Sequence, residues 1–297
     1  ENLTLKSLEL GFGVSADMFP LGAESELVAV ISFHEPDGVR AVRVAFPELS
    51  EFIQSRTTNR GFGNAQPLTE LDVEKLQSIQ KDNSERGLTI ITDREQLGRM
   101  GSVAGECDLI SMLNEHGHFD FFERNIRWTP TDYGATHDGV PLQPAQTPPG
   151  IFAALSVLRD QKVAAALRKV GGGNAVIQAT AQSVLSASCV GLIWIDKHSE
   201  ENFFHAGSHM QKLWLTATQL GYTLQPVFSP VFLFLRLESG EGLDAEEKEK
   251  LSNLKEIFRS ITKLEGDRKE VFLFKLSRTE MQVIPTKRLP LSEILFL

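Results

Sequence analysis

The chain has 297 residues, enough for one large domain or two of ordinary size, and 41% of its residues are hydrophobic, as in proteins that form a core. Its net charge of −9 excludes broad binding to a nucleic-acid backbone, although one local basic pocket for a phosphate remains possible. The absence of an apolar run of 18 residues argues against a membrane-spanning helix. Cys107 and Cys189 are far apart and outside any CxxC spacing, which predicts a reduced, cytoplasmic setting without a disulfide or zinc framework.

Helices and strands are mixed in the first part of the chain. Thr69 followed by Asp72 is typical of a helix N-terminus, whereas Gly98, Gly101 and Gly105 weaken the helical pattern around them. Apolar patterns and turn residues predict helices over 4–10, 47–55, 69–82 and 93–114, a buried strand over 27–33 and a further strand over 88–92.

A long segment without lasting periodicity follows, over 127–150. It holds five prolines and three glycines. Long irregular segments within a domain are usually functional lids or linkers. We therefore predict a lid-like loop at 127–150.

The remaining elements are again mixed. The glycines at 171–173 interrupt the helical pattern and predict a turn between two helices, because the P-loop Lys-Ser/Thr is missing after them. The patterns predict helices over 151–170, 175–187 and 200–220, a surface helix within 238–264, and strands over 190–195, 231–237 and 271–276.

Two distant stretches of the sequence have the same local pattern. Residues 5–13 and 213–222 each read as a helix that ends in Leu-Gly-aromatic before a strand. Helix–Gly–strand is a common pattern, so chance is one reading. The other is an internal repeat whose first copy is incomplete.

Few residues carry a recognisable catalytic or metal-binding pattern. His205 and His209 have the i, i+4 spacing of a zinc pair on a helix, but no third ligand has matching spacing, so we predict no metal. Gly11-x-Gly13 lacks the third glycine of a dinucleotide fingerprint. No residue is assigned a catalytic role.

One cluster has the groups that a phosphate requires. Arg56, Thr57, Thr58, Asn59 and Arg60 offer charged, hydroxyl and amide donors within five residues, and Lys287 with Arg288 offers cations from a distant part of the chain. The alternative is that Arg56 and Arg60 complement a helix C-terminus while Lys287-Arg288 is a solvated pair.

Three stretches in order resemble the FMN-dependent nitroreductase family. Ser55–Phe62 is similar to its arginine-rich signature, Ala206–Gly221 to its central helix, and Lys287–Glu293 to its closing motif. The region from Trp128 to Pro141 resembles a tandem-repeat branch that includes mycobacterial dormancy-associated proteins, and ThiF-fused nitroreductase-like domains are also similar.

This resemblance implies an α+β fold with a central, mostly antiparallel sheet flanked by helices and one and a half repeats. Residues 1–46 would be the remnant of a first repeat, without the family's Pro-Ser and Gln-Pro-Trp stretch, and 47–297 a complete second repeat with the lid at 127–150. The cofactor would be FMN, whose phosphate side the resemblance assigns to Arg56, Thr57, Thr58, Asn59, Arg60, Lys287 and Arg288.

The function that the resemblance implies is a bacterial oxidoreductase. Hydride would pass from NAD(P)H through the flavin to a small electron-poor acceptor such as a nitro compound or quinone. The alternative is a non-catalytic flavin-binding, storage or interaction domain of a larger protein, such as a ThiF-fused one; a covalently fused upstream domain is a further expected partner. The family's two-fold arrangement would come from a pseudo-dimer within the chain or from a homodimer, with no nucleic-acid or membrane partner.

Overall fold

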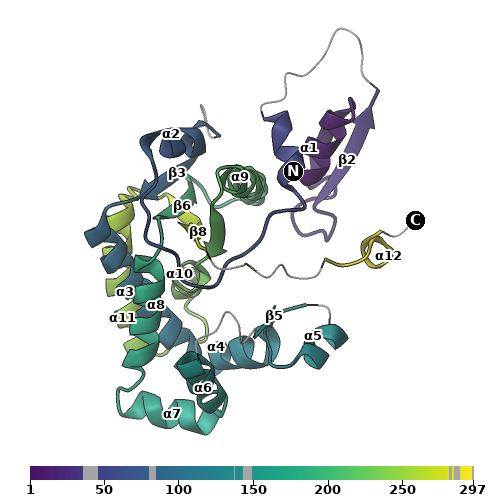
Figure 1. The fold of residues 1–297 in the computed structure, drawn as a ribbon. Helices are drawn as coiled ribbons and strands as arrows, with labels where there is room; N and C mark the ends of the chain where they lie inside the picture. The colour runs from purple at the N-terminus through teal and green to yellow at the C-terminus, as the bar shows by residue number, and fades with distance from the viewer. Residues whose placement is uncertain are drawn as a thin grey trace.

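A four-stranded antiparallel sheet lies at the centre of the protein (Figure 1). In this computed structural model the described residues are 1–35, 46–79, 85–136, 138–142, 149–280, 283 and 288–295. The strand order is β3-β6-β8-β7, and Leu192 of β6 lies opposite Thr89 of β3 and Leu273 of β8. The strands are β3 (Arg86–Ile91), β6 (Cys189–Ile195), β7 (Thr223–Pro226) and β8 (Lys269–Ser277). The predicted α+β class with an antiparallel sheet flanked by helices is confirmed.

Helices cover both faces of this sheet. Alternate residues of a strand face opposite sides, so Ile193 and Phe272 pack with α2 (Glu70–Ser78) and α9 (Glu200–Gln219). Leu192 and Leu273 pack on the other face with α3 (Arg94–Leu113), α10 (Phe228–Ser239) and α11 (Ala245–Thr262). The core therefore lies in two layers, one on each side of the sheet.

Helix α2 begins as the sequence predicts. The Thr69 side chain accepts a hydrogen bond from the Asp72 backbone N–H, and the Asp72 carboxylate accepts one from Thr69 in return. This capping box satisfies two donors that a helix start otherwise leaves unpaired. The last residues of the predicted helix, 80–82, lie outside the described residues.

The glycines of α3 allow close packing against α8 (Asn174–Leu185). A Cβ on Gly101 would lie 2.9 Å from the Ala181 Cα, and one on Gly105 would lie 2.6 Å from the Ile177 carbonyl oxygen. The helix forms despite its glycines because they lie where its neighbour approaches. Gly98, in contrast, has no atom within 4 Å of a Cβ added to it.

These glycines give a matched test of that packing. Gly105→Ala is expected to lower the free energy of unfolding by about 1–3 kcal/mol, because the new methyl group would meet rigid backbone. Gly98→Ala is expected to raise it by about 0.5–1 kcal/mol, because alanine is the better helix former and space is free. Urea unfolding of both variants measures these changes. If both substitutions raised the free energy of unfolding, or both lowered it, the packing argument would be contradicted.

The predicted strand over 231–237 is wrong, because these residues belong to α10. Short apolar runs fit a strand or a buried helix equally well. Phe228, Phe232 and Leu235 are exposed at helical spacing, while Val231 and Phe234 are buried. The strand on this side is β7, just before α10, which the sequence analysis missed.

The irregular segment predicted at 127–150 is partly wrong. It contains α5 (Pro130–Thr136) and the short strand β5 (Val140–Pro141), which pairs in parallel with β4 (Ile126–Arg127). Arg127 is buried and holds this segment together, since Nε donates to the Thr136 hydroxyl and the guanidinium pairs with Asp138. His137 and residues 143–148 lie outside the described residues, and a lid function stays a prediction.

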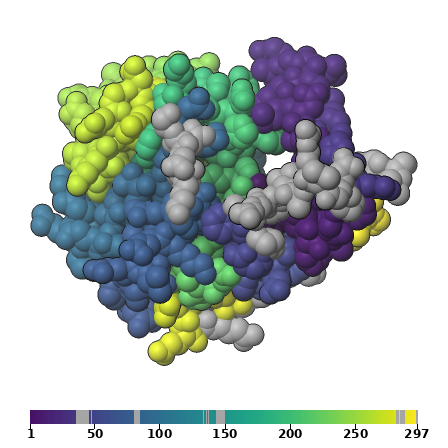
Figure 2. Space-filling view, turned by 90° about the horizontal axis from the view of Figure 1, so that it is seen from above, coloured from purple at the N-terminus to yellow at the C-terminus, as the bar shows by residue number. Residues whose placement is uncertain are grey.

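The N-terminal residues form a small separate layer, coloured purple at one side of the molecule in Figure 2. Helix α1 (Asn2–Glu9) packs on the 3₁₀ helix η1 (Pro47–Phe52), and its Leu5 meets Leu49 and Leu215. Strands β1 (Gly13–Met18) and β2 (Ala29–His34) form an antiparallel hairpin. Strand β2 is mostly exposed, so the predicted burial of this strand is wrong, and β1 was missed. The division into one and a half repeats stays a prediction.

Shorter helices complete the described structure. The helix predicted over 151–170 is two helices, α6 (Pro149–Leu158) and α7 (Gln161–Lys169). The helix is interrupted before Asp160, which caps the N-terminus of α7. The others are α4 (Glu115–Phe119), a π-helix η2 (Asp120–Asn125) and α12 (Leu291–Ile294).

Candidate functional site

Residues 56–60 run from η1 toward the edge of the sheet. Thr58 forms a parallel bridge with Leu224 of β7, and the Trp214 indole N–H donates to the Thr57 carbonyl oxygen at 3.3 Å. The Arg56 guanidinium lies 4.1 Å from the centre of the Trp214 ring. A cation over an aromatic face is attracted by the ring, so α9 fixes the position of this arginine.

The structure brings Arg288 to the same place. Its Nη2 donates to the carbonyl oxygens of Arg56 at 3.1 Å and Ile53 at 3.4 Å. Burial first, and the nearby charge of Arg288 second, lower the pKa of Arg56. Two arginines that are far apart in sequence therefore meet, as the phosphate-site prediction requires, whereas Lys287 lies outside the described residues.

Donors in this cluster lack acceptors. The Asn59 side chain is 6% exposed, and its Oδ1 accepts from the Gly61 N–H at 2.9 Å, which leaves Nδ2 without a partner in the described part of the chain. Arg56 Nε is also buried without one. Buried donors without acceptors cost free energy, so an anion at this place would stabilise the arrangement.

The other members of the predicted cluster have different positions. Thr57 and Thr58 are half-buried and contribute the backbone contacts described above. Arg60 is exposed. Trp214 is 7% exposed, and its ring contacts the Arg56 guanidinium.

Sequence analysis missed Lys275, which holds the loop after Asn59 in place through hydrogen bonds. This side chain of β8 is 2% exposed, and Nζ donates to the Gly61 carbonyl at 3.3 Å, the Ser183 carbonyl at 3.1 Å and the Ser183 hydroxyl at 2.5 Å. Burial lowers the pKa of Lys275 to about 8. Lys275 ties the loop after Asn59 to α8, and its only sequence signal is a charge within an apolar strand.

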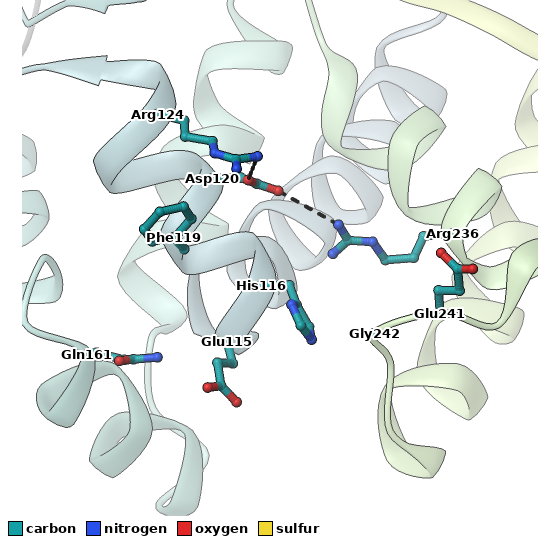
Figure 3. Close-up of a pocket in the computed structure, with 9 residues that line it drawn as sticks. All are labelled: Glu115, His116, Phe119, Asp120, Arg124, Gln161, Arg236, Glu241 and Gly242. Carbon is teal, nitrogen blue, oxygen red and sulfur yellow. Dashed lines mark hydrogen bonds and ion pairs between the residues drawn. The ribbon is translucent and has the colours of Figure 1, made fainter.

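Two polar hollows lie elsewhere on the surface. The first has a volume of about 620 Å³ and is shown in Figure 3. Its Asp120 lies between two arginines, 3.2 Å from Arg124 and 3.9 Å from Arg236. The second, about 510 Å³, contains the Lys250–Glu106 ion pair at 2.6 Å.

These hollows are weaker candidates than the arginine cluster. Several of their charges are already paired with one another, such as Asp120 with Arg124 and Glu106 with Lys250, so a ligand would have to compete with existing ion pairs. Within the described ranges, no acidic side chain forms an ion pair with Arg56 or Arg288. We therefore take the cluster around Arg56 as the candidate site.

His205 and His209 do not form a metal site with other residues of the described structure, which places no group of three or more His, Cys, Asp or Glu side chains around a common point. His209 is 7% exposed, with neither ring nitrogen hydrogen-bonded within these residues. Burial lowers the pKa of His209 to about 4, with smaller contributions from Lys212 and Arg86.

The described helices include none long and apolar enough to cross a bilayer.

Comparison with known proteins gives distant similarities. No protein-family model matches the chain. An uncharacterized protein of Mycobacterium tuberculosis, MT1398, is 28% identical over 224 residues, which are 74% of this chain. The chain spans about 30% of the length of that relative.

Solved structures with similarity to this chain include nitroreductases, a BluB-like flavoprotein and an iodotyrosine deiodinase. One with bound FMN from Bacteroides fragilis has a TM-score of 0.49 and 10% identity, covering 84% of this chain and 98% of that one. An FMN- and NADPH-dependent nitroreductase from Sphigopyxis sp. strain HMH has a TM-score of 0.46 and 16% identity, with coverages of 84% and 98%. One with bound FMN from Desulfitobacterium hafniense has a TM-score of 0.44 and 13% identity, with coverages of 84% and 97%.

Proposed function

We propose that this chain is a nitroreductase-type domain that binds FMN through a phosphate site at Arg56. The observation that carries the proposal is the meeting of Arg56 and Arg288, which have no carboxylate partner in the described structure, three residues before Asn59, whose amide Nδ2 also has no partner there. Two guanidiniums and an amide donor suit the several acceptor oxygens of a phosphate monoester.

The residues of the chain would hold and orient the cofactor. Arg56 and Arg288 would neutralise the phosphate, and Asn59 would donate through Nδ2. Trp214 would keep Arg56 in place, while Lys275 would fix the loop at Gly61. Bound FMN would supply hydride transfer, which no protein side chain can supply.

The reaction we propose is an oxidoreduction with NAD(P)H as donor and a small nitro compound or quinone as acceptor. We further propose that the chain belongs to the tandem-repeat branch, functions in a bacterial cytoplasm, and has two-fold symmetry from a pseudo-dimer or a homodimer. Because the chain spans about 30% of the curated relative, a fused upstream domain also fits. A non-catalytic flavin-binding or interaction domain is the competing outcome of the tests below.

A comparison of FMN with riboflavin tests the phosphate site directly. We expect the protein to retain FMN through gel filtration and to absorb between about 350 and 500 nm, because bound flavin absorbs there. Riboflavin is expected to be lost, since it lacks the phosphate that the arginines recognise. Equal retention of both flavins would contradict the phosphate site, and retention of neither would favour an interaction domain.

Turnover separates an enzyme from a store of flavin. NAD(P)H oxidation by the FMN-loaded protein, with a nitroaromatic compound or a quinone as acceptor, supports the oxidoreductase. FMN retained without turnover would contradict catalysis and leave the binding site intact.

A further inference from the structure

The C-terminal arm, residues 288–295, reaches the candidate site through Arg288. All eight residues are exposed, and α12 has no buried residue. In Figure 1 α12 lies away from the central sheet, on the side of the N-terminal unit. Arg288 reaches the body by donating to the carbonyl oxygens of Ile53 and Arg56.

The contact that docks the arm also brings two positive charges, those of Arg56 and Arg288, close together. To reach the Arg56 carbonyl, the arm brings a second guanidinium next to one that is already half-buried. Like charges repel, and the effect is larger where water is partly excluded. No described carboxylate forms an ion pair with either arginine. The Arg288 guanidinium donates the two hydrogen bonds that dock the arm, and its repulsion from the Arg56 guanidinium weakens this docking.

An anion between the two arginines would remove this repulsion. Resting on the proposed phosphate site, we propose that anion binding at Arg56 and docking of the C-terminal arm are thermodynamically coupled: a phosphate-bearing ligand fixes the arm, and the docked arm tightens the ligand. Coupling of this kind is reciprocal, so the factor by which phosphate stabilises docking equals the factor by which docking raises phosphate affinity.

The magnitude follows from the charges involved. A bridging phosphate replaces one repulsion by two attractions, and coupling between two sites is typically about 5- to 150-fold. Because Arg288 is exposed and screened by solvent, we expect a value near the lower end, about tenfold. The exposed Leu291 and Ile294 would then be held in place for a larger fraction of the time in the ligand-bound state.

Hydrogen exchange of the full chain tests the coupling. Amide exchange of residues 291–295 is measured with inorganic phosphate and with sodium chloride at equal ionic strength, while phosphate affinity is measured by calorimetry. Phosphate is expected to slow exchange of these amides about tenfold, and chloride is expected to leave it unchanged. FMN in place of phosphate is expected to act in the same direction.

Variants separate the coupling from folding defects. In Arg288→Gln, phosphate is expected to bind about tenfold more weakly and to leave arm exchange unchanged. Arg288→Lys keeps the charge and should retain part of both effects. The control is Arg268→Gln, because Arg268 lies 4.1 Å from the Trp194 ring and has no part in the contacts that define the site, so this variant should leave both readouts unchanged.

The outcomes distinguish the coupling from the site itself. Phosphate binding without any change in arm exchange would overturn the coupling and leave the proposed site standing. Failure of the unmodified protein to bind phosphate or FMN would overturn both. An Arg288→Gln variant whose arm still responds to phosphate would also overturn the coupling.

Discussion

Replacement of Arg56 by glutamine is expected to weaken FMN binding by about 10- to 100-fold, because a hydrogen bond to a charged group contributes about 1.5–3 kcal/mol. Arg56 is the best-placed cation of the site, stacked on Trp214 and close to Arg288. Quenching of flavin fluorescence on titration measures the loss. Stability is expected to change by less than about 1 kcal/mol, because the lost stacking is partly offset by relief of the repulsion between the two arginines.

A matched arginine makes this test specific. Arg268 lies over Trp194 at the same 4.1 Å as Arg56 over Trp214, but it has no place in the site. Arg268→Gln should therefore leave FMN affinity unchanged. Equal affinities of the Arg56→Gln variant and the unmodified protein would remove the main support for the phosphate site.

Acid is expected to destabilise the protein through His209. The pKa of His209 is lowered to about 4 in the folded state, mainly by burial, from the ordinary value of about 6.5 for an unfolded chain. Between these values the unfolded state binds the extra proton, so stability is lost as the pH falls from about 6.5 to about 4. The expected loss is about 3 kcal/mol, since one pKa unit corresponds to about 1.4 kcal/mol.

Urea unfolding at a series of pH values measures this loss. His209→Leu replaces the imidazole by an apolar side chain of similar size that cannot bind a proton, and it should flatten the profile over this pH window. His205→Gln is the control, because His205 is partly exposed on the same helix and should leave the profile unchanged. If the His209→Leu profile matched that of the unmodified protein, other groups would account for the acid sensitivity.

Local sequence predicted the elements whose signals are complete within a few residues. The capping box at Thr69 and Asp72 begins α2, and the apolar run of β6 forms a buried strand. The start of α2 depends on hydrogen bonds between neighbouring residues, and β6 depends on a short apolar run. The run over 231–237 was misread because the side chains that cover it come from α3 and α11.

The candidate site was predicted in part. The type of group at Arg56 and Asn59 is visible in sequence, and the motif resemblance pointed to Arg288. The supporting contacts are not visible in the sequence, because each joins distant residues. Trp214 is 157 residues from its partner Thr57, and Lys275 is 214 residues from its partner Gly61. Neither has a local pattern that distinguishes a supporting residue from an ordinary core residue.

The sequence by itself determined the donor groups at residues 56–60 and 288 and the main helices and strands with a clear local pattern, because these depend on residue type and short-range periodicity. Only the tertiary structure decided that Arg288 docks on Arg56, that the Asn59 amide has no partner among the described residues, and that the buried Lys275 donates to the loop at Gly61. The physical reason is that burial and charge repulsion depend on which distant segments meet. That meeting turned a set of basic residues into a candidate anion site coupled to the C-terminal arm.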